Sequence, residues 1–289
     1  MIILIGILVV IGSVIGGFLM EDGVLATLMH PSELVIIGGA ALGAMIIMAP
    51  KKVLIDLAKL SIQALKGTPF NRKAYDELFM ALYELFMLGR NSGLIALEEH
   101  LTTPTTSAIF LRYPSVVKNK DGLEFLCGAL RPVIDGRVKP DQLHELLETD
   151  LHRMDEEGHA PIDVLTKTGD ALPGFGIVAA VLGIVITMGA ISGPIEKIGL
   201  KVAAALVGTF LGIFISYGFV GPFATNMEFN LTARLAYFRT ISVAVVSFAL
   251  GTAPGMAIEL ARRALSDDLR PDADEMEKML KSATATQAK

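Results

Sequence analysis

The stretch that decides the fold is GDALPGFGIVAAVLGIVITMGA, residues 169–190. It carries no charged side chain after Asp170, although Pro173 stands near the start of its apolar run. A helix needs roughly 20 apolar residues to cross the ~30 Å hydrocarbon layer of a bilayer. Backbone groups in lipid are satisfied only inside helices or closed barrels. The stretch therefore predicts a membrane-spanning helix that begins close to a proline.

The composition of the whole chain agrees with a membrane protein. Of its 289 residues, 52% are hydrophobic and only 19% are charged, whereas a soluble domain has about a quarter charged residues. The net charge of -5 gives no indication of a nucleic-acid partner. A single cysteine, Cys127, excludes an internal disulfide and fits a reducing compartment. We expect an all-α integral membrane protein.

Four segments are long and apolar enough to be spans: Met1–Met20, Leu34–Pro50, Ala171–Gly193 and Val202–Val220. The first lacks a basic leader and a small-residue cleavage site, so we expect an uncleaved helix rather than a signal peptide. None of the four has an Asp, Glu, Lys, Arg or His in its interior. A fifth candidate, Thr240–Ile258, is rich in Ser, Thr and Gly and is interrupted by a proline, which favours a soluble or interfacial helix packed on its neighbours.

The basic residues predict the orientation, because Lys and Arg accumulate in cytoplasmic loops. The loop between the first two spans has neither, and the loop between the last two has only Lys197 and Lys201. Both termini are therefore expected in the cytoplasm. The predicted division is two spans in residues 1–50, a helical cytoplasmic domain in 51–168, two spans in 169–222, and cytoplasmic C-terminal helices with a tail in 223–289.

Small residues recur along every predicted span. The ridges comprise Gly12 and Gly16; Gly39 and Gly43; Gly176, Ala180 and Gly183; and Ala204, Gly208, Gly212 and Ser216. Such spacing lets helices approach backbone to backbone in a membrane. Helices of the same chain or of partner chains satisfy the pattern equally well.

The spans lack the titratable groups that mark ion pathways in membranes. Either the chain moves no ions or a partner supplies the group. Thr187 and Thr209 are the strongest polar side chains of the last two spans, and each either lines a path or bonds its own helix. Pro173 and Pro222 lie near the cytoplasmic ends of these spans, where a kink would transmit motion or form a static bend.

The segment 51–167 is polar and predicts several helices. Asn71 is expected to cap a helix from about Arg72 to Gly89, and a break at Gly93 leads to a short helix with Glu98 and Glu99. Further short helices are expected between prolines at 104, 114, 132, 140 and 161. The charge cluster of Arg90, Glu98 and Glu99 fits a contact surface or plain surface salt bridges.

Nothing in the sequence predicts an enzyme. No phosphate loop, nucleophile motif or paired Cys/His motif is present, so no catalytic residue is expected. His144, Glu148 and His152 share one face of a predicted helix, but a metal site needs ligands from elsewhere. We therefore expect no metal and no cofactor.

Several segments resemble a known family, the flagellar motor stator A subunit (MotA) within the MotA/TolQ/ExbB proton channels. PSELVIIGGAALGA, GDALPGFGIVAAVLGIV and LVGTFLGIFISYGFVGPFAT resemble its membrane segments. AYDELFMALYELFMLGRNSGLIALEEH resembles its cytoplasmic helix pair. The resemblance extends over nearly the whole chain, and only the tail after about Pro271 is unremarkable.

The resemblance implies a torque-generating assembly in the bacterial inner (cytoplasmic) membrane. In this family five A subunits are thought to ring a dimer of a B-type (MotB-like) subunit, whose helices carry the titrating aspartate. The alternatives are an ExbB/TolQ-like energiser of outer-membrane processes, whose relatives have three spans and an outside N-terminus, and a non-conducting membrane scaffold.

The resemblance also assigns residues. Positions matching Pro173 and Pro222 couple ion passage to movement, and those matching Arg90 and Glu98 face a FliG-like rotor switch protein. The threonine matching Thr209 lines the ion path. Sodium-driven relatives have a threonine where this chain has Ala180, which favours protons, because a desolvated sodium ion needs oxygen ligands.

Overall fold

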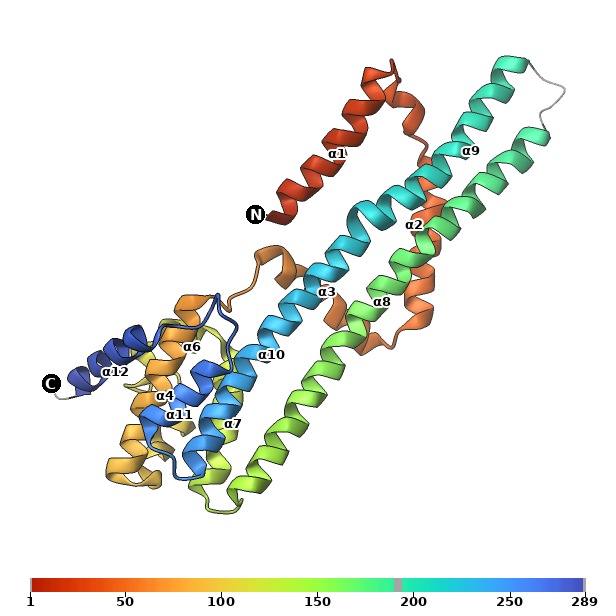
Figure 1. Ribbon diagram of the computed structural model, residues 1–289. Helices are drawn as coiled ribbons and strands as arrows, with labels where there is room; N and C mark the ends of the chain where they lie inside the picture. The colour runs from red at the N-terminus through yellow and green to blue at the C-terminus, as the bar shows by residue number, and fades with distance from the viewer. Residues whose placement is uncertain (1, 190–193, 288–289) are drawn as a thin grey trace. The chain divides into compact units, whose positions relative to one another are not determined.

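The computed structural model describes residues 2–189 and 194–287, without the side chains of 196, 197 and 284–287. All regular elements of this described part are helices and it contains no strand, which confirms the all-α prediction (Figure 1). The chain divides into two compact units, one formed by residues 1–67 and 157–230 and the other by 68–156 and 231–289. Each unit is described separately.

The first unit contains the apolar helices. Its elements are α1 (Ile2–Met20), the 3-10 helix η1 (Leu25–Leu28), α2 (Pro31–Met48), α3 (Lys51–Lys66), the later part of α8 (Pro140–Met188), α9 (Ile195–Ile215), the π-helical turn η4 (Ser216–Val220) and the start of α10 (Gly221–Ala249). Four helical stretches have the length and composition to cross a membrane: Ile2–Met20, Leu25–Met48, Pro140–Met188 and Ile198–Ala249. Each predicted span overlaps one of them, although two of the predictions extend past Met48 and Met188. Met1 and residues 190–193 lie outside the described residues.

Helix α8 is longer than the sequence predicted. It runs for 49 residues and holds both Pro161 and Pro173 in its interior. Pro132 likewise lies inside α7 (Lys120–Ile134). The prediction that Pro132 and Pro161 separate short helices is therefore wrong. A proline removes one hydrogen bond from a helix, and burial of neighbours such as Leu130 and Ile162 offsets that loss.

Helix α2 begins earlier than the predicted span. Pro31 occupies its first turn, where a missing backbone N–H costs nothing because that group has no helical acceptor. The helix therefore includes Glu33, whose residue surface is only 5% exposed. The predicted span Leu34–Pro50 left this residue outside the helix.

The second unit is a helical domain with one hydrophobic core. Its elements are α4 (Arg72–Ser92), η2 (Leu94–Leu97), α5 (Glu98–Thr102), η3 (Phe110–Arg112), α6 (Pro114–Lys118), α7, the start of α8, the end of α10, α11 (Pro254–Arg263) and α12 (Ala273–Gln287). The Asn71 side chain accepts a hydrogen bond from the backbone N–H of Ala74 at 3.1 Å, which confirms the predicted cap. The core is built around α4, where Tyr75, Phe79 and Phe86 are fully buried.

The segment that resembled a fifth span belongs to this core. Ile241, Val245 and Ile258 are fully buried in it, and the ring of Phe248 stacks on Phe86 with centroids 4.3 Å apart. Helix α10 ends at Ala249, and Gly251 then turns the chain with a φ of +85°. The segment is apolar because it packs inside a helical domain, as predicted.

Candidate functional site

The contact between α8 and α9 is backbone to backbone, and the two helices lie side by side in Figure 1. A β-carbon placed on Gly176 would lie 2.8 Å from the carbonyl oxygen of Gly208. A β-carbon on Gly212 would lie 2.6 Å from the carbonyl oxygen of Leu172. Neither position has room for a side chain. These ridges therefore serve packing within one chain.

The glycines of α1 and α2 have a different environment. A β-carbon on Gly12, Gly16, Gly39 or Gly43 would meet no atom of the described residues within 4 Å. Helix α1 also buries none of its residues. These glycine faces of α1 and α2 therefore contact no other helix of the described chain, whereas the glycines of α8 and α9 pack against each other.

Ala180 and Thr209 flank the same α8–α9 contact. The backbone nitrogen of Ala180 lies 3.5 Å from the β-carbon position of Gly208, the neighbour of Thr209. The Cα atom of Thr209 lies 3.3 Å from the β-carbon position of Gly176. Both residues are half-buried, and the Thr209 hydroxyl has no hydrogen-bond partner among the described residues. The structure thus brings two of the sequence-predicted path residues together.

Thr187 lies two turns beyond Ala180 on α8, which places it on the same face of that helix. Its side chain is buried, and its hydroxyl donates to the carbonyl oxygen of Gly183 at 2.8 Å. This local bond satisfies the proton of the hydroxyl group. The Thr187 hydroxyl oxygen can still accept a hydrogen bond from another donor.

Sequence reasoning missed Glu33, which joins this contact from α2. Its Oε2 atom lies 2.7 Å from the position that a β-carbon of Gly208 would occupy. That atom is buried and has no hydrogen-bond partner in the described part of the chain. Pro31, two residues earlier, marks in the sequence a helix start that includes Glu33, but it does not indicate that the side chain is buried.

Pro173 and Pro222 lie near one further contact of the first unit. A β-carbon on Gly169, one turn before Pro173, would lie 2.9 Å from Cγ1 of Val220. Val220 ends the π-helical turn that precedes Pro222. A π-turn shifts the hydrogen-bond pattern from i→i+4 to i→i+5, and such turns are frequent at functional sites. The helix is thus irregular where both proline segments meet.

The polar site of the second unit surrounds the end of α4. Arg90 and Glu98 are exposed, and neither has a hydrogen-bond or ion-pair partner among the described residues. The alternative that they form plain surface salt bridges is therefore not observed. Between them Gly93 turns the chain with a φ of +87°, which favours glycine.

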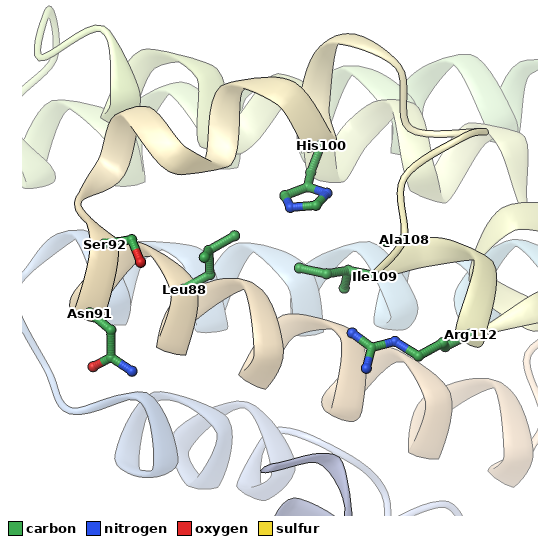
Figure 2. Close-up of a pocket in the computed structure, with 7 residues that line it drawn as sticks. All are labelled: Leu88, Asn91, Ser92, His100, Ala108, Ile109 and Arg112. Atoms are coloured by element: carbon green, nitrogen blue, oxygen red, sulfur yellow. The ribbon is translucent and has the colours of Figure 1, made fainter. Parts of the chain in front are cut away.

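An open pocket of about 640 Å³ lies beside this turn (Figure 2). Its lining residues are Leu88, Asn91, Ser92, His100, Ala108, Ile109 and Arg112. The Nδ1 atom of His100 lies 2.8 Å from Oγ of Ser107. Arg112 pairs with the buried carboxylate of Glu84. Two of the lining residues, His100 and Arg112, are therefore held in place by Ser107 and Glu84, which do not line the pocket.

Glu84 connects α4 to the loop that forms the far wall of the pocket. Its Oε1 atom accepts a hydrogen bond of 2.6 Å from the Tyr113 hydroxyl, while Oε2 faces Arg112. Burial, together with this bond to Glu84, raises the pKa of Tyr113. The hydroxyl therefore stays a donor, and the Glu84 carboxyl, whose residue surface is only 1% exposed, keeps both of its partners.

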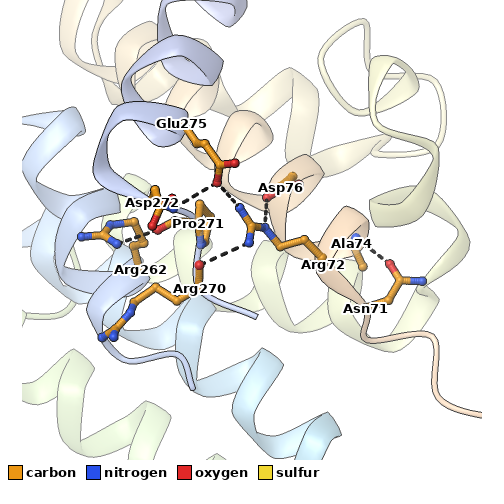
Figure 3. Close-up of polar contacts among 9 residues, drawn as sticks. All are labelled: Asn71, Arg72, Ala74, Asp76, Arg262, Arg270, Pro271, Asp272 and Glu275. Atoms are coloured by element: carbon orange, nitrogen blue, oxygen red, sulfur yellow. Dashed lines mark hydrogen bonds and ion pairs between the residues drawn. The ribbon is translucent and has the colours of Figure 1, made fainter. Parts of the chain in front are cut away.

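The opposite end of α4 is clamped by the C-terminal segment (Figure 3). The Arg72 guanidinium donates to Asp76 at 3.1 Å, to Glu275 at 2.6 Å and to the carbonyl oxygen of Arg270 at 3.2 Å. Met276 of α12 is buried in the core of the unit. The tail that looked unremarkable in the sequence therefore fixes the helix that carries Arg90.

The histidines considered as metal ligands do not assemble a site in the described structure. Within residues 2–189 and 194–287 no group of three His, Cys, Asp or Glu side chains is placed to hold a metal ion. His152 instead lies 3.4 Å from Glu156 on the same helix.

Comparison with known proteins agrees with this architecture. Residues 4–93 match the motility protein A N-terminal model, and residues 119–240 match the MotA/TolQ/ExbB proton channel family. Motility protein A of Salmonella typhimurium is 34% identical over 282 residues, which cover 98% of this chain and 96% of that protein. The chemotaxis protein LafT of Vibrio parahaemolyticus is 36% identical over 275 residues, with 95% and 96% covered.

Solved structures share the fold. The C. jejuni MotAB structure matches with a TM-score of 0.78 at 22% identity, covering 94% of this chain and 98% of that one. The flagellar MotAB stator complex of Bacillus subtilis matches with a TM-score of 0.74 at 22% identity, covering 92% and 97%. The match of residues 4–93 to the motility protein A N-terminal model and the similarity to motility protein A itself favour the stator function over the energiser alternative.

Proposed function

On the premise that the chain belongs to the motility protein A family, we propose that its α8–α9 pair lines an ion path and passes movement to the flagellar rotor. The chain is a membrane protein and a flagellar stator subunit. With a B-type partner it forms an ion channel and converts ion flow into torque. We assign it no enzymatic activity and no bound cofactor.

The observation that carries this proposal is the chemistry of the α8–α9 contact. The residues assigned to the path, Ala180, Thr187 and Thr209, are methyl or hydroxyl side chains, and none of them titrates in the physiological range. Glycines bring the helix backbones together, so the pair forms a rigid, apolar wall. These three side chains cannot carry an ion themselves, so a carboxylate is required on the path, and the B-type, MotB-like subunit is proposed to supply it.

The driving step is electrostatic. A proton from outside neutralises the partner carboxylate against α8 and α9. Neutralisation removes a desolvation cost of several kcal/mol for a buried carboxylate, so the preferred position of the two subunits shifts. A transmembrane potential provides about 2.3 kcal/mol per charge per 100 mV. That energy is sufficient for a small step but not for large refolding, which fits a pair of proline-containing segments meeting at Gly169 and Val220.

We propose that the complex transports protons and not sodium ions. Ala180 provides no side-chain oxygen where it faces Gly208, and a desolvated sodium ion requires several oxygen ligands. Motility in sodium-free medium tests this choice. Dependence on sodium would contradict it.

We further propose the assembly and its place in the cell. Several copies, five by family analogy, surround a B-subunit dimer in the bacterial inner membrane. Both termini, residues 51–168 and residues 223–289 lie in the cytoplasm, while residues 1–50 and 169–222 form the spans. The open faces of α1 and α2 support contact with lipid or neighbouring copies.

Arg90 and Glu98 are proposed to face the FliG-like rotor switch protein. Both are exposed and without partners among the described residues, so their charges are free to steer an encounter. Complementation tests the whole proposal. Expression with its B partner in a strain lacking both stator subunits should restore swimming, whereas a partner with its membrane aspartate changed to asparagine should not. Failure of the unmodified pair would reject the function.

A further inference from the structure

A buried acid lies where the apolar helices of the first unit meet. The Glu33 carboxyl belongs to α2 but reaches Gly208 of α9, and its Oε2 atom has no hydrogen-bond partner among the described residues. Ala179 and Ala180 of α8 border the same spot, because both lie within 3.5 Å of the β-carbon position of Gly208. The carboxyl is therefore surrounded by small apolar groups from two other helices, α8 and α9.

This contact is deep within the α8–α9 pair rather than at its tip. Gly208 follows the first residue of α9 by 13 residues, which is about 20 Å along the helix axis. Ala180 precedes Met188, the last residue of α8, by about 12 Å. These distances place the Glu33 carboxyl away from the ends of α8 and α9, although Glu33 itself lies in the first turn of α2. Ionisable side chains among membrane-spanning helices are rare and mark ion paths.

Neighbouring charges do not pair with this carboxyl. On α9, Lys201 is the one charged residue with a described side chain, and it lies seven residues or about 10 Å from Gly208. On α8, Asp170 is exposed and lies on the face opposite Ala179. On its own helix, the cap residue His30 precedes Glu33 by three residues and is half-buried. None of these three forms an ion pair with Glu33 in the described structure.

A buried carboxylate without a partner is strongly unfavourable, so the group requires a proton or a cation. A metal ion is a poor fit, because no three acidic, His or Cys side chains of the described residues gather as ligands. A proton satisfies the carboxyl alone. The half-buried His30 at the start of α2 offers the approach for that proton from the loop side.

We propose that Glu33 is a proton-binding carboxyl on the ion path, contributed by this chain in addition to the carboxylate of the partner. Its role on the path rests on the proposed function. The carboxylate takes a proton from the His30 side and returns it beside Ala180 and Thr209, with no covalent change. Gly208 is part of the site, since only glycine leaves room for the carboxyl group.

Infrared spectroscopy of the full chain in lipid tests the proton directly. The difference spectrum of wild type minus Glu33→Gln at neutral pH should show the carbonyl band of a protonated carboxylic acid, shifted in heavy water. The matched control is Glu21→Gln, because Glu21 is an exposed acid in the loop that precedes α2. Its difference spectrum should lack that band.

A second variant keeps the test informative if Glu33→Gln does not fold. Gly208→Ala retains the acid but places a β-carbon 2.7 Å from Oε2, so it should shift the same band. Three results would overturn proton binding at Glu33. The band could be absent in wild type, it could remain unchanged in Glu33→Gln, or it could stay at the same frequency in Gly208→Ala.

Proton flux through the complex with its B partner tests the role on the path. Glu33→Gln should reduce the flux several-fold, and Glu21→Gln should leave it unchanged. Unchanged flux in Glu33→Gln would overturn the path role. A wild-type complex that conducts no protons would instead reject the proposed function. The infrared test of proton binding at Glu33 does not depend on that outcome.

Discussion

Gly212 of α9 and Gly176 of α8 touch at backbone distance. A β-carbon on Gly212 would lie 3.0 Å from the Cα atom of Gly176 and closer still to the carbonyl oxygen of Leu172. Backbone atoms cannot rotate away as a flexible side chain does. The two helices therefore have one spacing, and that spacing sets the shape of the wall that faces the partner.

Gly212→Ala should destabilise the first unit by about 1–3 kcal/mol, because overpacking forces the helices apart. Thermal unfolding of the purified chain in detergent measures this loss. Gly39→Ala is the matched control, since a β-carbon there meets no described atom within 4 Å. Equal stability of the two variants would mean that α8 and α9 are not held this closely.

Pro173→Ala should leave membrane insertion close to normal and slow or stop rotation. The substitution restores a backbone N–H inside α8 and regularises the helix one turn after its contact with Val220. Cell fractionation measures insertion, and tethered-cell rotation measures torque. Pro161→Ala, in the same helix but farther from that contact, controls for a general effect of removing a proline. Full rotation in Pro173→Ala would show that the proline forms only a static bend.

Arg90→Glu should impair torque and leave stator assembly intact. The Arg90 side chain is exposed and has no partner in the described residues, so its loss removes no internal bond. Swimming speed and co-purification with the B partner provide the two measurements. Arg137→Glu reverses another exposed charge of the unit, one that pairs with Asp135 at 3.5 Å, and should preserve swimming. Loss of assembly in Arg90→Glu would make Arg90 structural.

Acid should weaken the second unit through Glu259. Its carboxylate accepts hydrogen bonds from Arg262 at 2.6 and 2.8 Å and from Arg263 at 2.7 Å. These bonds, that of Arg262 first, lower the pKa of Glu259 from 4.5 to about 2. A lowered folded-state pKa stabilises the fold above pH 4.5, and this contribution is lost as the pH falls from 4.5 towards 2.

Glu259→Gln should therefore reduce stability at pH 7 by about 1–3 kcal/mol, since Arg262 is buried and loses a charged acceptor. The variant should also lose less stability than wild type between pH 5 and pH 2. Unfolding followed by circular dichroism at each pH measures both effects. Glu99→Gln, an exposed acid without a described partner, should behave as wild type. Parallel pH curves for wild type and Glu259→Gln would contradict this role.

Local patterns in the sequence predicted most of the fold. The apolar stretches identified the four long helices, and Asn71 marked the start of α4 as its bond to Ala74 shows. The segment 240–258 was correctly predicted to pack on its neighbours, because Ile241, Val245 and Ile258 are buried in the core of the second unit. These features depend on neighbours within a few turns, which a sequence displays directly.

Features that depend on distant contacts were harder to predict. Pro161 stays inside α8 because the helix is stabilised along its length by other elements. The tail proved to be a folded helix because Arg72, about 200 residues away, binds Glu275. Glu33 was missed because its burial depends on Gly208 having no side chain. No local pattern contains that information.

The central claim is that this chain builds the wall of a proton path while the partner supplies the carboxylate that completes it. Proton flux into liposomes measures this most directly. The purified chain alone should conduct no better than empty liposomes, and the chain with its B partner should conduct. Conduction by the chain alone would contradict the account.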